Sequence, residues 1–153
     1  MTPISNALTY YFNAWRAHEE EQACINYAVV LESLFSPNSN VELSHRIAYN
    51  IACFLDERPD YRKTIFETVK KFYSLRSRII HGACPEWMDP LVYSGVMFAI
   101  SSKILEMIFL NPDYFQIFSS AKSRYRLFDE WLFHKTGPQI LSDLIRQADF
   151  KSG

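Results

Sequence analysis

A long helical pattern ends in the run Phe72-Tyr73-Ser74-Leu75-Arg76-Ser77-Arg78-Ile79-Ile80-His81-Gly82. The apolar residues of that pattern recur in steps of four, three and seven, at Ile65, Val69, Phe72 and Ile79. The position that completes this stripe is 76, which holds arginine. A stripe with this spacing normally faces a core or a partner helix. Because a permanent cation there costs free energy unless it snorkels, pairs or binds an anion, we expect a functional site at this point.

Composition predicts one helical domain. The chain has 153 residues, 48% of them hydrophobic and 22% charged, as in ordinary globular proteins. We expect a single domain over residues 1–153, since a chain of this length buries roughly 70% of its unfolded surface without staples. Aromatic residues, at 16%, favour a heavily packed core, a large apolar interface, or both. The scarcity of glycine, with 4 residues, fits helices better than tight-turned sheets.

Charge is uneven along a chain that is almost neutral. The net charge of −1 gives no global field of the kind that marks nucleic-acid binders. The segment from Arg58 to Arg78, however, has seven basic and two acidic residues, a local charge of +5. The ordinary interpretation of such a run is a solvated helix face, and the alternative is a surface that binds an anion.

Neither the cysteines nor the apolar segments point to secretion, a metal or a membrane. Cys24, Cys53 and Cys84 are odd in number and far apart, which argues against a disulfide framework and a zinc site. We expect no metal, no cofactor and, since the N-terminus lacks the features of a signal peptide, a cytoplasmic protein. The apolar stretch 91–110 could be mistaken for a membrane span, but Lys103 and Glu106 interrupt it. We therefore expect it to be the central helix of a soluble bundle, with Cys24 and Cys53 as core thiols.

Helical periodicity dominates the chain, and alternating strand patterns are nearly absent. Asp60 is a candidate N-cap, Gly82 a C-terminal stop, and Asp89-Pro90 a helix start. The expected fold is an all-α bundle of about five to seven helices. The helices are predicted at about residues 4–17, from 18–21 to 35, 41–57, 60–81 and 90–110, then a region after 111, and 139–148.

Arg76 and His81 are the candidate catalytic residues. Histidine titrates near pH ~6.5, and the arginine fork matches phosphate oxygens. Together they suffice for metal-free RNA cleavage, with His81 exchanging protons at the ribose 2′-oxygen or the leaving 5′-oxygen and Arg76 holding the phosphate. The structural alternative is a histidine that caps the helix and an arginine that bonds nearby carbonyls or carboxylates. Residues five apart on a helix differ by roughly 140° in direction, so the helix must unwind near Gly82, or a second copy must contact the stripe and form a shared cleft.

Three blocks in order, Val29–Phe35, Glu42–Ala48 and Val69–Gly82, resemble HEPN domains of the ApeA-like group. The resemblance covers roughly residues 20–110 and leaves 112–150 as a C-terminal helical extension. It implies a helical bundle, a homodimer and metal-independent ribonuclease activity on RNA, with phage defence or a toxin system as the setting. Arg76 and His81 occupy the R-x4-6-H positions of the family. Ala83 stands where toxins controlled by a nucleotidyltransferase carry tyrosine.

Further residues receive roles beside these two. Ser77, Arg78 and Lys70 are the candidate substrate-binding residues. Glu32 and Arg46, on the helices of the first two blocks, either form a buried pair that orients the helix carrying Arg76 or touch RNA.

His45 and Trp87 are predicted to have packing roles, and a function other than RNA cleavage is also possible for the domain. We expect His45 to be a surface or packing residue, and Trp87 to pack its loop rather than stack on a base. The alternative to a ribonuclease is a non-catalytic module that dimerises or docks a protein partner, or a nucleotide-binding domain.

Overall fold

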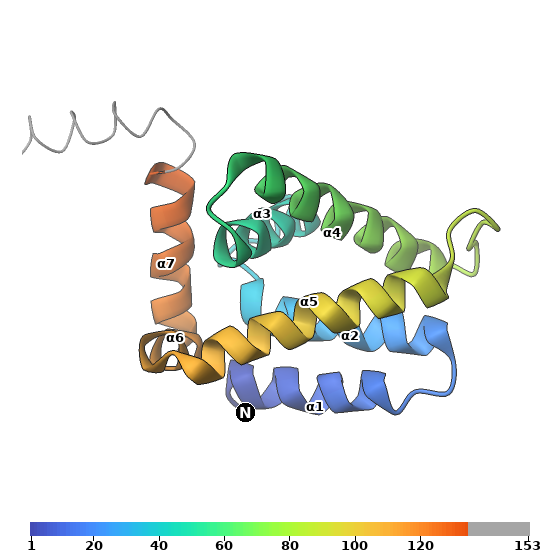
Figure 1. Cartoon of the computed structure of the whole chain (residues 1–153), viewed down its shortest axis with the longest axis horizontal. Helices are drawn as coiled ribbons and strands as arrows, with labels where there is room; N and C mark the ends of the chain where they lie inside the picture. The colour runs from blue at the N-terminus through green and yellow to red at the C-terminus, as the bar shows by residue number, and fades with distance from the viewer. Residues whose placement is uncertain (135–153) are drawn as a thin grey trace, which may run out of the picture.

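A computed structural model describes residues 1–134, and these residues form seven α-helices and no strand, which confirms the all-α prediction. Figure 1 shows their order in space. The helices are α1 Pro3–Trp15, α2 Glu20–Phe35, α3 Leu43–Leu55, α4 Pro59–Ile80, α5 Pro90–Leu110, α6 Pro112–Phe118 and α7 Ala121–His134. The expected single helical region after residue 111 is two helices, α6 and α7. The helix predicted at 139–148 lies outside the described residues.

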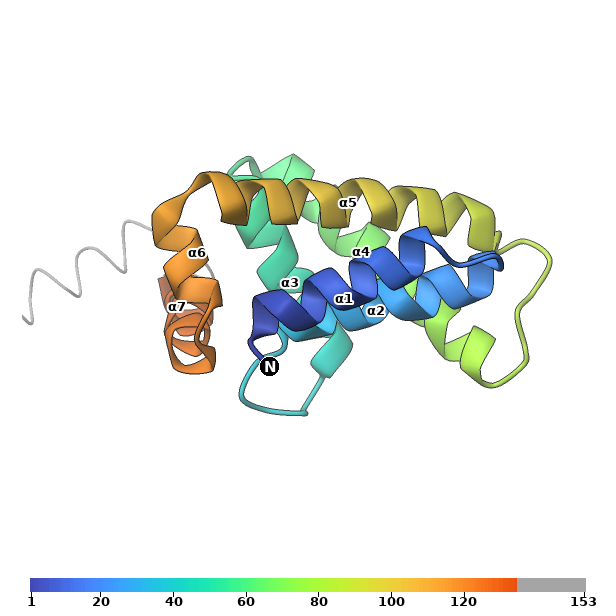
Figure 2. The same ribbon diagram turned by 90° about the horizontal axis from the view of Figure 1, so that it is seen from below.

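The central helix is α2, not α5. Helices α1, α4 and α5 all pack on α2, and α3 packs on α4 (Figure 1). Figure 2 shows α5 along one long side of the molecule. Only a third of its most apolar window is buried, so the prediction of a central helix at 91–110 is wrong. By length and composition alone α5 could also cross a membrane, but a single helix of this kind is weak evidence, because core helices of soluble proteins and signal sequences satisfy the same test.

The apolar stripe of α4 is used inside its own chain. Val69 and Phe72 are completely buried, and so is Leu75 beside them. Helices α3 and α2 pack on α4 and supply the atoms that cover this stripe. The expectation that a second copy contacts the stripe is therefore wrong, because its apolar members are already in contact with the core.

The C-terminal end of α4 is fixed by backbone hydrogen bonds around Gly82, as predicted. Gly82 has φ of 68°, a left-handed conformation that glycine adopts without steric cost. The Ala83 N–H donates to the Arg78 carbonyl at 2.9 Å, and the Gly82 N–H donates to the Ile79 carbonyl at 3.1 Å. This is the Schellman arrangement, which places His81 at the last position of the helix.

The two predicted starts of helices α4 and α5 differ in outcome. Asp89 caps α5 by accepting a hydrogen bond from the Leu91 N–H at 2.9 Å, and Pro90 is the first helical residue, as predicted. Asp60 is not the cap of α4 but lies in its first turn. The helix starts earlier because Pro59 has a helical φ by covalent geometry and stands at the first helical position.

An aromatic cluster joins α2 to α3, α6 and α7 at one end of the molecule. The ring of Phe35, fully buried, lies 5.5 Å from Phe54, 5.4 Å from Phe118 and 6.1 Å from Phe128, measured between centroids. The buried Arg124 adds two hydrogen bonds of 2.7 Å to backbone carbonyls in the last turn of α2. These contacts fix the C-terminal end of α2. Glu32, the candidate functional residue on this helix, lies at that end. Cys24 and Cys53 are buried, as predicted.

Candidate functional site

A pocket of about 350 Å³ opens between α2, the first turn of α3 and the second half of α4. Polar side chains dominate its lining, and they come from all three helices. The lining residues are Glu32, Leu43, Ser44, Lys70, Tyr73, Ser74, Arg76 and Ser77. Four residues that the sequence singles out for function, Glu32, Lys70, Arg76 and Ser77, are thus brought to one place.

Arg76 enters this pocket with part of its hydrogen-bonding capacity unused. A terminal nitrogen of its guanidinium lies 3.7 Å from a Glu32 carboxylate oxygen, and the Arg76 side chain is 34% exposed. Its Nε is buried and has no hydrogen-bond partner among residues 1–134. A distance of 3.7 Å allows electrostatic attraction but exceeds that of a good hydrogen bond. The Nε is thus shielded from solvent, and the exposed part of the side chain lines the pocket, where it can donate to an anion.

Glu32 and Tyr73 are both affected by burial beside Arg76. Burial raises the pKa of the Glu32 carboxyl, and the nearby Arg76 charge lowers it in part. Burial also raises the pKa of Tyr73 well above its ordinary value, with the Glu32 charge acting in the same direction. The Tyr73 hydroxyl is buried and makes no hydrogen bond within residues 1–134. A buried hydroxyl without a partner is costly, and this one is shielded from solvent at the wall of the pocket.

Lys70 and two serines complete the polar lining. The Lys70 ammonium donates to the Ser44 hydroxyl at 3.3 Å, which ties α4 to the start of α3. Ser77 lies one residue beyond Arg76 and is exposed. With Lys70 and Arg76 against Glu32, the pocket carries a net positive charge, which suits a phosphate group.

His81 lies outside the pocket, at the exposed end of α4. Its side chain makes no hydrogen bond or ion pair within residues 1–134, although its backbone N–H donates to the Ser77 carbonyl at 3.1 Å. The imidazole is thus free in solvent rather than engaged as a helix cap. Within one chain, His81 does not line the pocket that Arg76 enters.

Arg78 and Trp87 form a second exposed feature beside His81. The Arg78 guanidinium carbon lies 5.8 Å from the centroid of the Trp87 ring. The expectation that Trp87 packs its loop is wrong, since the residue is 75% exposed. Its loop, from Ala83 to Met88, returns to the core through the buried Met88 and leaves the Trp87 indole outside, against the Arg78 cation.

The structure does not pair Glu32 with Arg46. Glu32 lies against Arg76, whereas Arg46 lines a different hollow with Ser39 and Asp129. His45 is exposed and its ring packs edge-on against Phe66, with centroids 4.9 Å apart, which confirms a surface or packing residue. Within residues 1–134, no three histidine, cysteine or acidic side chains are grouped so as to hold a metal ion.

Sequence reasoning missed Tyr73 and Ser44 as pocket residues. Tyr73 follows Phe72 in the helix and reads as one more apolar member of an aromatic-rich segment. Ser44 stands two residues before Arg46 in the second block, and no pattern distinguishes it from other serines. The signal that exists is the spacing of Tyr73 and Arg76, three apart, which places both on one face of the helix.

Comparison of the chain with protein-family models, with curated proteins and with solved structures gives no match. The HEPN resemblance therefore depends on the motif and the three sequence blocks alone.

The Glu32→Gln variant tests the electrostatics of this pocket through pH. Because the folded-state pKa of Glu32 lies above its ordinary value of 4.5, the folded chain binds the Glu32 proton more tightly than the unfolded chain. Stability from this group is present below the ordinary value and is lost as pH rises through the raised one. We expect wild type to lose unfolding free energy relative to Glu32→Gln over that window, measured by urea titration at a series of pH values.

Glu67→Gln, on the exposed face of the same helix, is the matched control and should show no such trend. A constant difference between wild type and Glu32→Gln across the window, or a difference of opposite slope, contradicts the assignment.

Proposed function

We propose that this chain is a HEPN-type, metal-independent endoribonuclease in which Arg76 and His81 act at a cleft between two copies. The observation that carries the proposal is the state of these two side chains. Within residues 1–134 the exposed His81 side chain at the end of α4 has no partner, and Arg76 lines a cationic pocket on the same helix with 34% of its side chain exposed. Both side chains are therefore accessible to a substrate, unlike a histidine that caps a helix or an arginine in a saturated ion pair. The setting that the resemblance implies is phage defence or a toxin system, and the N-terminal sequence favours the cytoplasm.

The proposed chemistry is an internal transesterification of RNA. One His81 imidazole removes the proton of the ribose 2′-hydroxyl, and the 2′-oxygen attacks the neighbouring phosphorus. The bond from phosphorus to the 5′-oxygen breaks, and that oxygen receives a proton from an imidazolium, the His81 of the second copy. Arg76 and Lys70 hold the non-bridging oxygens and stabilise the charge that develops there. The products are a 2′,3′-cyclic phosphate and a free 5′-hydroxyl.

Two copies are needed because one chain separates its catalytic groups. The two residues are five apart on a regular helix, roughly 140° different in direction, and only Arg76 lines the pocket. A second copy placed with its α4 end beside the first would supply an imidazole to each Arg76. Arg78 and Trp87, exposed beside His81, would then contact the flanking nucleotides through charge and stacking.

The test is cleavage of cellular RNA by the purified protein in EDTA. We expect cleavage of RNA, products that end in a 2′,3′-cyclic phosphate, and no cleavage of the same sequence as 2′-O-methyl RNA, which lacks the nucleophile. Cleavage of 2′-O-methyl RNA, or intact RNA at high protein concentration, contradicts the proposal.

A second candidate, a nucleotide-binding or interaction module without catalysis, is favoured by one observation. The pocket offers Lys70 and Arg76 to a phosphate without any contribution from His81. In that case mononucleotides would protect the fold against thermal unfolding, and RNA would stay intact.

A further inference from the structure

Two cysteine thiols lie at the start of α5, one from α2 and one from the loop between α4 and α5. The Cys24 thiol donates to the Pro90 carbonyl at 3.5 Å. The Cys84 thiol donates to the Met88 carbonyl, two residues earlier, at 3.5 Å. Carbonyls two residues apart lie within roughly 7 Å of each other. Both thiols are therefore held against one short stretch of backbone, at the end of the molecule where α2 and α5 begin (Figure 1, Figure 2).

The electrostatics of Cys24 also indicate that the two thiols are neighbours. The pKa of the Cys24 thiol is raised to about 12, mainly by burial and in part by the charges of Glu20 and of the Cys84 thiolate. An effect of one thiol on the other requires a short separation, because charge interactions weaken with distance. The third cysteine, Cys53, is buried in α3 and interacts with Tyr49 instead.

We infer that Cys24 and Cys84 are a site of reversible oxidation, and that they form a disulfide bond when the protein meets hydrogen peroxide. A disulfide places its two Cα atoms ~5.5–6 Å apart. Cys24 is held within α2, whereas residues 83–85 have no helical structure. The hydrogen bonds of the Cys84 thiol go to carbonyls of its own loop, so the loop can carry Cys84 to Cys24 without breaking a contact with another helix.

The two thiols differ in exposure, and this difference sets the order of the chemical steps. Cys84 is half-buried, whereas Cys24 is completely buried. The Cys84 thiolate attacks one oxygen of the peroxide, the O–O bond breaks, and Cys84 becomes a sulfenic acid while hydroxide leaves. The Cys24 thiol then loses its proton and attacks the Cys84 sulfur, whose S–O bond breaks to release a second hydroxide. The two hydroxides take up the two thiol protons, so two thiols become one disulfide and the peroxide becomes two waters.

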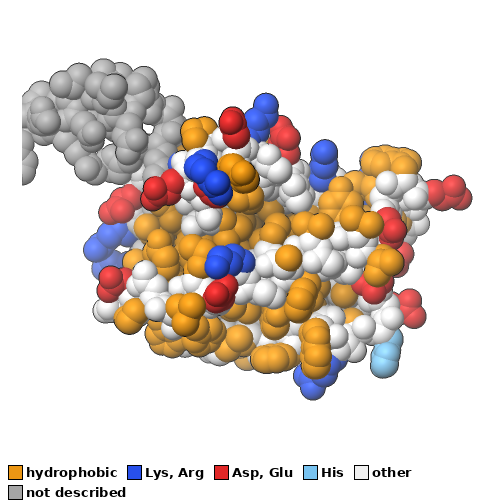
Figure 3. Space-filling view, in the orientation of Figure 1, with side chains coloured by type: hydrophobic (Ala, Val, Ile, Leu, Met, Phe, Trp, Pro, Cys, Tyr) orange, Lys and Arg blue, Asp and Glu red, His pale blue; other side chains and the backbone are white. Residues whose placement is uncertain are grey.

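A small neutral oxidant suits the surface around this pair. Figure 3 shows acidic side chains gathered at this end of the molecule, on the right of the view. Exposed acidic residues precede or begin α2 and lie in the loop before α5, and they are Glu19, Glu20, Glu21, Glu86 and Asp89. Such a surface repels anionic oxidants, oxidised glutathione among them, but does not repel hydrogen peroxide.

The pair is independent of the proposed ribonuclease activity. Cys84 follows His81 by three residues, so the bond would tie the segment beyond His81 to α2, whatever reaction His81 takes part in. The sequence alone gives no sign of the pair, because the two cysteines are far apart in the chain and only the packing of α2 beside α5 brings them together. Where a compartment is reducing, cysteine pairs of this kind close only transiently, under oxidising conditions.

The experiment treats the full reduced chain with hydrogen peroxide under native conditions and maps its peptides without reduction. Trypsin places each cysteine in a different peptide, 17–46, 47–62 or 79–103. We expect the intact mass to fall by two hydrogen atoms, and peptide 17–46 to be linked to peptide 79–103. Dithiothreitol should reverse both changes, since the bond is a disulfide.

The same oxidation in urea shows whether the fold selects the pair. Cys53 lies between the other two cysteines in the sequence, so either of its bonds closes a shorter loop than a bond between Cys24 and Cys84. Shorter loops cost less entropy to close. We therefore expect the unfolded chain to favour bonds to Cys53, and the folded chain to exclude them.

Three single variants assign the steps. Cys53→Ala should form the bond as wild type does. Cys84→Ser should keep its two remaining thiols reduced, because both are buried. Cys24→Ala, with its thermal midpoint recorded, should stop at a sulfenic acid on Cys84 that dimedone traps. In wild type the sulfenic acid should appear before the disulfide, because the raised pKa of Cys24 leaves little thiolate for the second step.

Three results contradict the inference. They are a disulfide of the folded chain that includes Cys53, a disulfide between the Cys84 residues of two copies, and a folded chain whose Cys24 stays reduced after peroxide treatment. The readouts are masses and peptide links, so this inference and the proposed ribonuclease activity can each fail without the other.

Discussion

Replacing His81 with alanine is expected to lower the rate of RNA cleavage by a factor of ~10²–10⁴, the usual contribution of a positioned acid or base. The fold should be unchanged, because the imidazole is exposed and makes no hydrogen bond or ion pair within residues 1–134. The measurement is the initial cleavage rate in EDTA at pH 7, with the thermal midpoint recorded on the same samples. His18→Ala, at another exposed histidine between α1 and α2, is the control and should cleave like wild type.

The same variant decides whether the site is composite. Arg76→Gln should also be inactive, since its phosphate donors are gone. Because each reaction in the proposed cleft uses the His81 of both copies, mixing wild type with an excess of His81→Ala forms dimers with a single imidazole and should lower the activity per wild-type chain. Activity per wild-type chain that the excess variant leaves unchanged would contradict the shared cleft. Activity retained by His81→Ala would remove His81 from the mechanism altogether.

The helix ends that the sequence predicts well are those fixed by local chemistry. Gly82 ends α4 because its left-handed conformation completes two backbone hydrogen bonds, and Asp89 with Pro90 starts α5 by a cap and a preset φ. These effects involve residues that are neighbours in the sequence, so they can be predicted without knowing how the helices pack. Asp60 was the exception, because Pro59 beside it is as good a starting residue and stands earlier.

The buried faces of the helices are harder to predict where the apolar pattern has no gap. Helix α5 is apolar all round, with Met97 and Ile104 buried on one side and Phe98 and Leu110 exposed on the other. Such a pattern is typical of a central helix, and only the packing of α1 and α4 on α2 makes α5 an outer one. In α4, by contrast, charged residues mark the outer face, and the stripe through Val69 and Phe72 is buried as its period requires.

The composition of the candidate site depends on contacts between distant residues. The sequence identifies Arg76 by its conflict with the stripe, and the structure explains the conflict, since Glu32 on α2 provides a counter-charge at 3.7 Å. The sequence alone does not predict whether Glu32 pairs with Arg46 or with Arg76, because both cations lie on helices that follow it. The packing of α3 and α4 against α2 determines which of the two lies close to Glu32. Tyr73 escaped notice because its hydroxyl matters only once the pocket exists.

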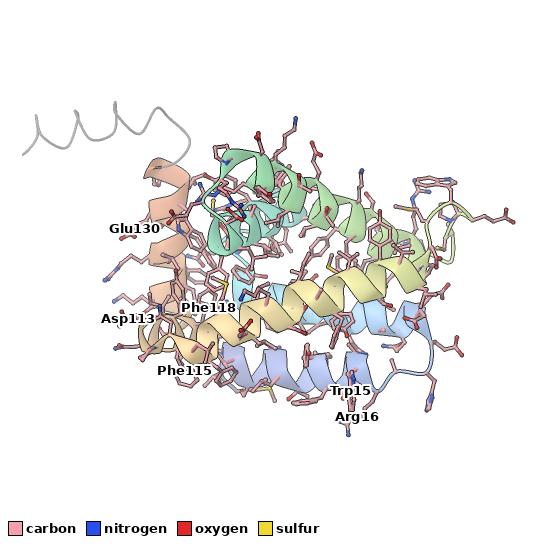
Figure 4. The ribbon with its side chains drawn as sticks, viewed as in Figure 1. Trp15, Arg16, Asp113, Phe115, Phe118 and Glu130 are labelled. Atoms are coloured by element: carbon pink, nitrogen blue, oxygen red, sulfur yellow. The ribbon has the colours of Figure 1, made fainter. Side chains whose placement is uncertain are left out.

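Replacing Phe35 with alanine is expected to lower the free energy of unfolding by about 3–5 kcal/mol, a large part of the 5–15 kcal/mol of a typical domain. Phe35 is fully buried and contacts three other aromatic rings from α3, α6 and α7, so its removal leaves a cavity where four helices meet. Figure 4 shows one of these rings, Phe118, directed into the molecule. Urea titration with a fluorescence or circular dichroism readout measures the change.

Phe115→Ala on α6 is the matched control for this cluster. Phe115 is 43% exposed and contacts the partly exposed Phe109 ring at 5.6 Å, so its loss should cost no more than about 1 kcal/mol. Equal losses for the two variants would mean that the four helices are not held together at Phe35. The cluster also fixes the end of α2 that carries Glu32, and therefore a destabilised Phe35→Ala protein should lose the pH response of Glu32 while Phe115→Ala keeps it. Such a difference would place the pocket in the part of the fold that depends on this aromatic core.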